Sequence, residues 1–212
     1  MSAHLTSEQF LKDVGSHTMS VLHDDGVYRH LRFAKPGTSH MHFDIVTWPG
    51  YLAYTGDMGA FTFTRLRDML DFFRTSPANP FNIDRRYWAE KCVAEGRHGD
   101  GVWEHDSDAF RREVELLRRC LMVRSCRGMN PEERKEVWDS LQEVVNLSDD
   151  ANRCWVALYD WRHTTWSGKT LRLDCDEPPR CLTYTRRFQW CCYALAWAVH
   201  QYDSHLIARE AA

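Results

Sequence analysis

The sequence predicts an α+β fold: an N-terminal helix, a four-stranded antiparallel meander, and a mostly helical C-terminal portion with a long buried final helix. Four short runs with period-two alternation follow one another between residues 27 and 64, separated by turn residues. Most segments after residue 65 instead repeat apolar side chains at helical spacing. Because no internal repeat marks a second unit, we expect a single domain over 1–212, with a sheet region at about 24–64 and a helical region at about 65–206.

The first helix is expected over residues 7–22, where apolar side chains recur at helical spacing and Thr6 with Gln9 fits a capping box. The four expected strands are 27–33, 40–48, 51–55 and 60–64. Their short connections favour an antiparallel meander. Pro49-Gly50 fits a type II turn, and Gly56 and Gly59 permit the next reversal, so structural need accounts for both turns.

Helices are predicted after the meander because each segment has an apolar stripe, a capping residue or both. Asn130-Pro131 is the clearest start, since a capping side chain precedes a proline in the first turn. Segment 169–176 alternates and predicts a short extra strand. The predicted helices are 65–74, 84–96, 108–123, one that begins at Asn130, 149–161 and 182–203.

Composition excludes several classes of function. A net charge of −3 argues against binding a nucleic-acid polymer, which needs a concentrated positive surface. The most apolar stretch, 188–199, is shorter than the roughly 20 residues that a membrane span needs, and no secretory signal opens the chain. The eight cysteines contain no Cys-x-x-Cys pair, which favours reduced, buried thiols in a cytoplasmic protein over a zinc site. We therefore expect no cofactor, no resident metal and no membrane partner.

Strand alternation places polar side chains of the first two strands on one shared face. A solvent-facing sheet surface is commonly polar, so a solvated face is one interpretation. The other is a ligand platform, in which Tyr28 stacks on a ring while His30 and Arg32 meet phosphate or carboxylate. The ligand types His40, His42 and Asp44, with His30 across the ladder, also fit a divalent metal, although no spacing fixes a third ligand. The face comprises Tyr28, His30, Arg32, His40, His42 and Asp44.

Other motifs were weighed against this face. Ser167-Gly168-Lys169-Thr170 lacks the glycine that a phosphate-binding P-loop requires. Gly56-Asp57-Met58-Gly59 is followed by a strand, so it is not a dinucleotide fingerprint. Trp88 and Lys91 lie on a helix whose aromatics fit core packing. If that helix crossed the polar face, they would close a nucleotide pocket.

Four strings of the sequence resemble a family of proteins encoded by tailed bacteriophages and prophages. They are "DDGVYRHLRF", "FDIVTWPGYLAYTGDMGAFTF", "YWAEK" and "WCCYALAWAVHQYD", and together they span most of the chain. The resemblance implies a dispensable accessory protein in the bacterial cytoplasm during infection, of the kind that counters host defences. It does not extend to the His-x-His at 40–42.

The leading hypothesis is a phage counter-defence protein that binds and sequesters a small anionic nucleotide signal and is not an enzyme; a homo-oligomer is left open. Arg32 and Lys91 would meet phosphates, Tyr28 or Trp88 would stack, and Asp57 would accept a hydrogen bond from ribose. The first alternative is a phosphodiesterase that degrades a cyclic or ADP-ribose-type nucleotide. The second is an inhibitor that docks directly on a host defence protein. The ligand residues are Tyr28, His30, Arg32, Asp57, Trp88 and Lys91, and the alternative catalytic residues are His30, His40, His42 and Asp44.

Overall fold

The computed structural model describes residues 5–96, 101–147, 150–173 and 181–211, and within them the fold is α+β, as predicted. The chain groups into two compact units. The sheet unit consists of Ser2–Glu104 and Tyr184–Ala212, and the helical unit consists of His105–Thr183. The single domain that we expected over 1–212 stays a prediction. The sheet unit is built from both ends of the chain, so the helical unit interrupts it in sequence, a relation that periodicity does not reveal.

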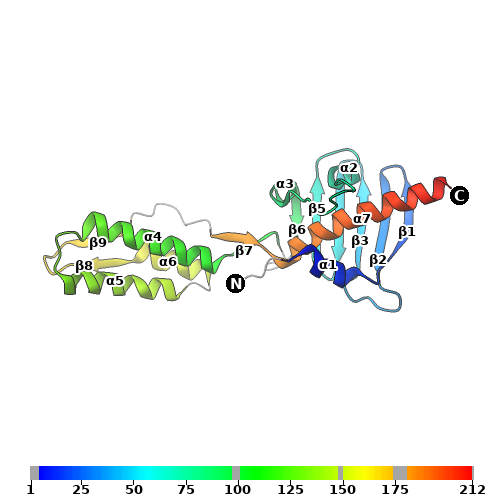
Figure 1. The fold of residues 1–212 in the computed structure, drawn as a ribbon. Helices are drawn as coiled ribbons and strands as arrows, with labels where there is room; N and C mark the ends of the chain where they lie inside the picture. The colour runs from blue at the N-terminus through cyan, green and yellow to red at the C-terminus, as the bar shows by residue number, and fades with distance from the viewer. Residues whose placement is uncertain (1–4, 97–100, 148–149, 174–180, 212) are drawn as a thin grey trace. The chain divides into compact units, whose positions relative to one another are not determined.

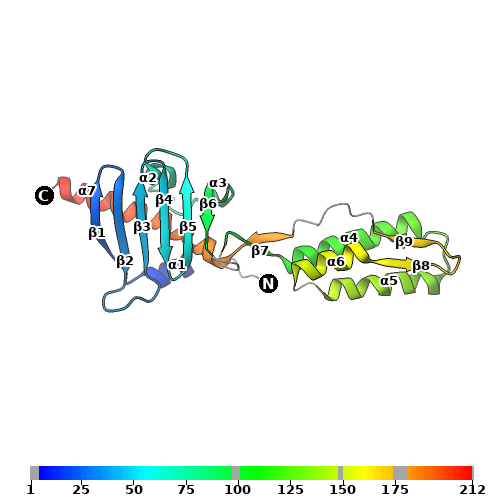
Figure 2. The same ribbon diagram turned by 180° about the vertical axis from the view of Figure 1, so that it is seen from behind.

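The sheet unit contains a six-stranded antiparallel sheet whose strands follow chain order (Figures 1 and 2). The predicted meander is present as its four central strands. The four-strand count was wrong, because one further strand pairs at each edge. The strands are β1 (Thr18–Asp25), β2 (Tyr28–Ala34), β3 (Phe43–Trp48), β4 (Tyr51–Gly56), β5 (Gly59–Thr64) and β6 (Cys92–Glu95).

Both edge strands lie where helices were predicted. Helix α1 (Ser7–Val14) starts at the predicted Thr6 capping box but ends well before residue 22. Residues 18–25 form β1 instead, because Met19 and Val21 alternate inward opposite the buried strand β2. Likewise α3 (Arg85–Glu90) is followed directly by β6. Apolar residues four positions apart fit both the helical and the strand period. The pattern alone therefore does not distinguish a strand from a helix in these two segments.

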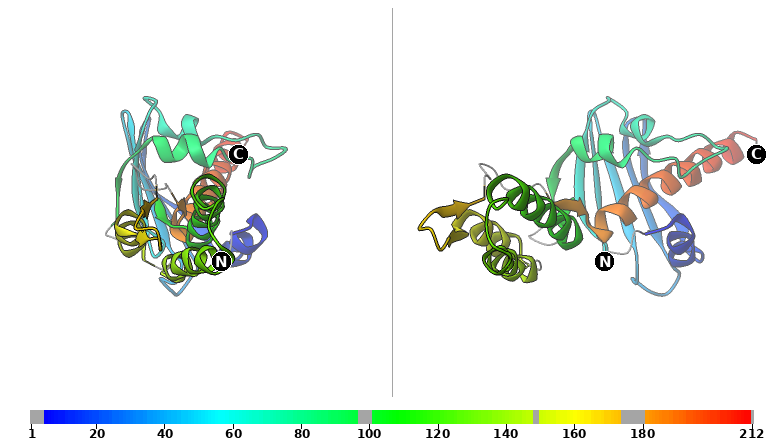
Figure 3. Two further views of the ribbon diagram at one scale, coloured as in Figure 1. Left: turned by 90° about the vertical axis from the view of Figure 1, so that its left-hand side faces the viewer. Right: turned by 60° about the vertical axis from the view of Figure 1, so that its left-hand side comes forward.

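Helix α7 (Arg186–Glu210) crosses one face of the sheet, and with α1 and α2 (Met69–Phe73) it covers that face (Figures 1 and 3). Its apolar middle meets an aromatic layer. The Phe43 ring stacks on Phe33 at a centroid distance of 4.8 Å and meets Trp190 edge-on at 5.5 Å. The predicted long buried final helix is confirmed. Burial of such rings contributes strongly to stability, since replacing one of them by alanine typically costs ~3–5 kcal/mol.

A polar network fixes the C-terminal part of α7 to the sheet. The guanidinium of Arg29 donates to both oxygens of Asp68, at 3.0 and 2.8 Å, and to the hydroxyl of Tyr202 at 3.2 Å. That hydroxyl in turn donates to Asp24 at 2.7 Å. Arg29 therefore lies on the covered face, and its charge is compensated by two carboxylates.

The helical unit packs three helices and a β-hairpin around a second apolar core (Figure 1). Asn130 caps α5 as predicted, by accepting from the amide of Glu133 at 2.8 Å. Ser167 and Gly168 lie in the hairpin turn, which supports rejection of the P-loop. The predicted strand at 169–176 is confirmed only as β9, and residues 174–176 lie outside the described ranges. The elements are α4 (Ser107–Ser125), α5 (Pro131–Asn146), α6 (Ala151–Asp160), β8 (Arg162–Thr164) and β9 (Thr170–Arg172).

Strands β7 (Trp103–His105) and β10 (Leu182–Tyr184) pair with each other at the points where the chain leaves and re-enters the sheet unit. Among the described residues, no helix is both long and apolar enough to cross a lipid bilayer.

Candidate functional site

The face of the sheet opposite α7 is the candidate site, and strand alternation explains its composition. Leu31 and Phe33 of β2 are fully buried beneath α7. The alternate residues of the same strand, Tyr28, His30 and Arg32, therefore project from the opposite face. Tyr28 is 50% exposed, and the Arg32 side chain is 44% exposed. The predicted sharing of one open face by these three side chains is consistent with this pattern.

Asp44 of β3 joins this face directly beside Arg32, its partner in the β2–β3 ladder. Its Oδ1 lies 2.9 Å from Nε2 of His30, and its Oδ2 lies 3.6 Å from a guanidinium nitrogen of Arg32. The carboxylate side chain is only 13% exposed, so the two neighbours shield it from solvent. Because the Asp44 carboxylate is shared between His30 and Arg32, the Arg32 guanidinium keeps N–H donors that can reach a bound anion.

Arg32 also lines a recess of about 450 Å³, within the ~300–1,000 Å³ range of small-molecule pockets. Its walls offer two cationic side chains, Arg32 and Lys35, together with four hydroxyl-bearing residues. None of the described residues that line it carries a carboxylate. An anion would therefore meet positive charge and hydrogen-bond donors without direct repulsion from the walls. We call this the anion recess, and it is lined by Thr18, Ser20, Arg32, Ala34, Lys35, Pro36, Gly37, Thr38 and Ser39.

Of the residues that line the anion recess, only Arg32 was predicted from the sequence as a ligand residue. Thr18 and Ser20 belong to β1, where the sequence predicts the end of a helix, and Lys35 follows β2 in the loop to β3. Ser20 lies directly opposite Arg32 in the β1–β2 ladder. The signal was the alternation of polar and apolar residues from Thr18 to Val21, which fits a strand as well as a helix.

An aromatic group lies at the other end of the same open face. Trp48 and Tyr51 stack across the β3–β4 turn, with ring centroids 5.4 Å apart and planes at 15°. Arg29 pairs with Thr47, so one residue further along both strands Tyr28 comes level with Trp48. Tyr28 and Arg32 are four residues apart on β2, which corresponds to about 13 Å at ~3.3 Å per residue. We call Tyr28, Trp48 and Tyr51 the aromatic group.

Two predicted ligand residues do not belong to this face. Trp88 is only 4% exposed and packs edge-on against Phe73, with ring centroids 4.7 Å apart, so it is a core residue. Lys91 caps α3, and its ammonium lies 5.0 Å from the centre of the Tyr87 ring. Both precede the edge strand β6, which is four strand positions from β2, or ~19 Å at ~4.8 Å per strand. The helix expected to close the pocket is therefore elsewhere.

Asp57 has a different role from the one we expected. Its carboxylate accepts a hydrogen bond from the amide of Met41 at 2.6 Å and lies 3.3 Å from Nδ1 of His42. Met41 has a φ of 59°, an unusual backbone conformation for a residue with a side chain. Asp57 therefore holds the loop between β2 and β3, part of which lines the anion recess.

The alternative quartet His30, His40, His42 and Asp44, which we considered for phosphodiesterase or metal chemistry, does not assemble. His40 and His42 precede β3 instead of lying on it, because the strand begins at Phe43. Nδ1 of His42 lies 2.7 Å from the carbonyl oxygen of Ser39, within the same loop. In the part of the chain that the structure describes, no cluster of three or more His, Cys, Asp or Glu side chains could hold a metal ion. Only His30 and Asp44 of the quartet are in contact.

None of the described cysteines is in a disulfide, and Cys175 lies outside the described residues. Burial in the sheet unit raises the pKa of Cys191 and Cys192 well above the ordinary value, so both stay protonated and unreactive. They are part of the core.

Comparisons with protein-family models, curated proteins and solved structures return no match.

Proposed function

We propose that the protein binds a small nucleotide ligand on the open face of the sheet unit, with a phosphate in the anion recess and a base against the aromatic group. The observation that carries the proposal is the recess itself, where Arg32 and Lys35 lie among hydroxyl groups and no described lining residue carries a carboxylate. A guanidinium can form paired hydrogen bonds with phosphate oxygens, which a point charge cannot.

The distance between the anion recess and the aromatic group favours an extended ligand. A molecule that contacts both Tyr28 and Arg32 needs a base and a phosphate about 13 Å apart, given ~3.3 Å per strand residue. A mononucleotide is short for this span, whereas a dinucleotide or a nucleoside diphosphate sugar has intervening phosphate and ribose groups. His30 lies between the ends and supplies a further ring nitrogen.

The biological role follows from the resemblance to phage-encoded proteins. We propose a counter-defence protein that acts in the cytoplasm of the bacterial host and removes a nucleotide signal by sequestering it. The net charge of −3 supports this preference for a small anion over a nucleic-acid polymer, because binding a polymer needs a concentrated positive surface.

The test is recovery of intact ligand. The protein is incubated separately with cyclic dinucleotides and with ADP-ribose derivatives, freed of unbound compound, and denatured by heat. Sequestration predicts that at least one compound is retained and released unchanged. Arg32→Ala should abolish retention and ligand-induced thermal stabilisation, whereas Arg86→Ala, which removes an arginine 86% exposed on α3, should alter neither. Equal retention by the wild-type protein and Arg32→Ala would remove the recess from the site.

The second candidate is a phosphodiesterase that works by acid/base chemistry. It rests on His30, whose Nε2 is oriented by Asp44 at 2.9 Å, a pairing suited to proton transfer. Released fragments in the same experiment, lost in His30→Gln and unaffected by EDTA, would favour it. Absence of both retention and fragments, with a host protein that co-purifies, would favour the direct inhibitor.

A further inference from the structure

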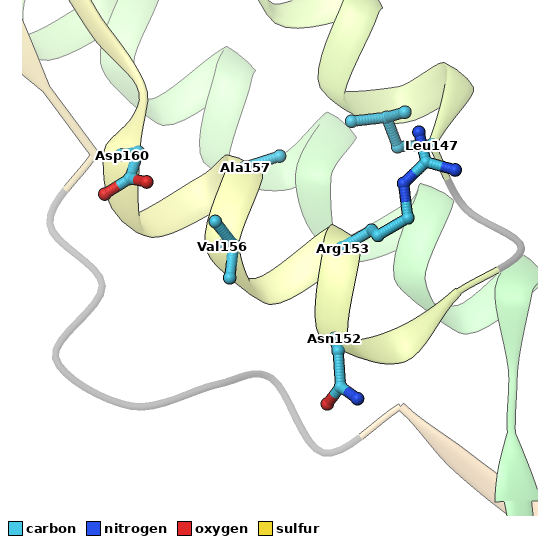
Figure 4. Close-up of a pocket in the computed structure, with 6 residues that line it drawn as sticks. All are labelled: Leu147, Asn152, Arg153, Val156, Ala157 and Asp160. Atoms are coloured by element: carbon cyan, nitrogen blue, oxygen red, sulfur yellow. The ribbon is translucent and has the colours of Figure 1, made fainter.

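The helical unit carries an outward face on α6 that the nucleotide proposal does not use. Figure 4 shows Arg153 and Asp160 at opposite ends of this helix, with Val156 and Ala157 between them. Together with Leu147 and Asn152 they line a shallow pocket of about 360 Å³. Val156 is 55% exposed, which is a large exposure for a branched apolar side chain at the centre of a helix.

The charges at the two ends of this face have no partners within the described residues. Neither Arg153 nor Asp160 makes an ion pair there, although exposed charges elsewhere on α4 and α5 do. They are seven residues apart, so they lie nearly on one side of the helix, about 10.5 Å apart along its axis at ~1.5 Å per residue. The face therefore has a positive end, an apolar middle and a negative end.

We propose that this face binds α6 of a second copy of the chain in an antiparallel, two-fold symmetric contact. Antiparallel pairing about the point between Val156 and Ala157 brings Arg153 of each copy beside Asp160 of the other. The same surface of each copy then pairs with its counterpart on the other copy, which is the defining property of an isologous interface. Val156 of one copy meets Ala157 of the other, and these small side chains allow close approach of the helices.

Charge complementarity selects this occupant over others. A uniformly acidic or basic partner would leave one end of the face opposed by like charge, whereas an antiparallel copy pairs both ends. One helix face is smaller than the ~800 Å² per partner of a standard stable interface, so the dimer is reversible and depends on concentration. The contact uses only the helical unit, and its loss leaves the anion recess intact.

The test is a charge swap read by sedimentation equilibrium over a range of protein concentrations. The wild-type mass should rise with concentration from 25.0 kDa toward twice that value. Arg153→Asp and Asp160→Arg should each weaken association by about tenfold or more, since each places like charges together at both symmetric contacts. The double variant Arg153→Asp/Asp160→Arg should restore it. Arg124→Asp, which reverses an exposed charge on α4, should have no effect.

Salt gives a second readout that misfolding would not reproduce. At about 1 M salt, where the screening length is ~3 Å, wild-type association should weaken while that of each single reversal improves. Circular dichroism verifies that every variant retains its helices. A wild-type protein that stays at 25.0 kDa, or a double variant no better than the single ones, would overturn the proposal.

Discussion

Replacing Asp57 by alanine is expected to release the loop that lines the anion recess. The carboxylate accepts from the amide of Met41 at 2.6 Å and lies 3.3 Å from His42. A hydrogen bond to a charged group contributes ~1.5–3 kcal/mol when shielded, but Asp57 is 41% exposed, so the lower part of that range applies. The partly exposed pair with His42 adds ~0–1 kcal/mol. We therefore expect a loss of about 1.5–2.5 kcal/mol in the free energy of unfolding.

The assay combines urea unfolding with hydrogen exchange at the Met41 amide. Asp57→Ala should lower the unfolding free energy and speed exchange at that amide, because the unusual backbone of Met41 (φ 59°) loses its partner. Asp57→Asn should retain most of the protection, since its amide oxygen can still accept. Asp25→Ala, an exposed carboxylate on β1, serves as the control and should change stability by less than ~0.5 kcal/mol. Unchanged Met41 protection in Asp57→Ala would refute this role.

Three further predictions concern the sheet unit. Gly56→Ala should cost ~2–4 kcal/mol in urea unfolding, because an added Cβ would lie 2.3 Å from the carbonyl oxygen of His42; an unchanged unfolding midpoint would contradict this. Tyr202→Phe should cost ~1–2 kcal/mol, since it removes a hydrogen bond to Asp24 and an acceptor for Arg29; a double-mutant cycle with Asp24→Ala should show coupling. Burial raises the pKa of Cys92 from 9.0 to about 11. The protonated thiol thus favours the folded state, and its contribution, complete below pH 9, is lost as pH rises to about 11. Cys92→Ala should show a shallower fall in stability over that window, and parallel curves would contradict the assignment.

The fold was predictable wherever one period dominated. Strands β2 to β5 alternate cleanly between turn residues, and the side chain of Asn130 with the following proline marks the start of α5. The edge strands were not predictable, because short runs such as Thr18–Asp25 fit both periods and their pairing partners lie elsewhere in the chain. The division into two units depends on contacts between the two ends of the chain, which no local pattern contains.

The candidate site was predictable only along one hairpin. Side chains alternate between the two faces of a strand with a repeat of two residues, and this alternation is enough to place His30, Arg32 and Asp44 on one face. Trp88 and Lys91 were wrongly assigned to the site. Their inclusion required the helix before β6 to cross the polar face at β2, but β6 lies four strand positions from β2 in the sheet. The role of Asp57 depends on a loop conformation that local sequence does not determine.

Binding at the anion recess is tested most directly by titrating isotope-labelled protein with ADP-ribose and with a cyclic dinucleotide and following backbone amide resonances. Our account predicts saturable shifts at Ser20, Arg32 and Lys35 with at least one of these compounds, and their loss in Arg32→Ala. Shifts confined to residues outside the recess and the aromatic group, or no shifts with either compound, would contradict it.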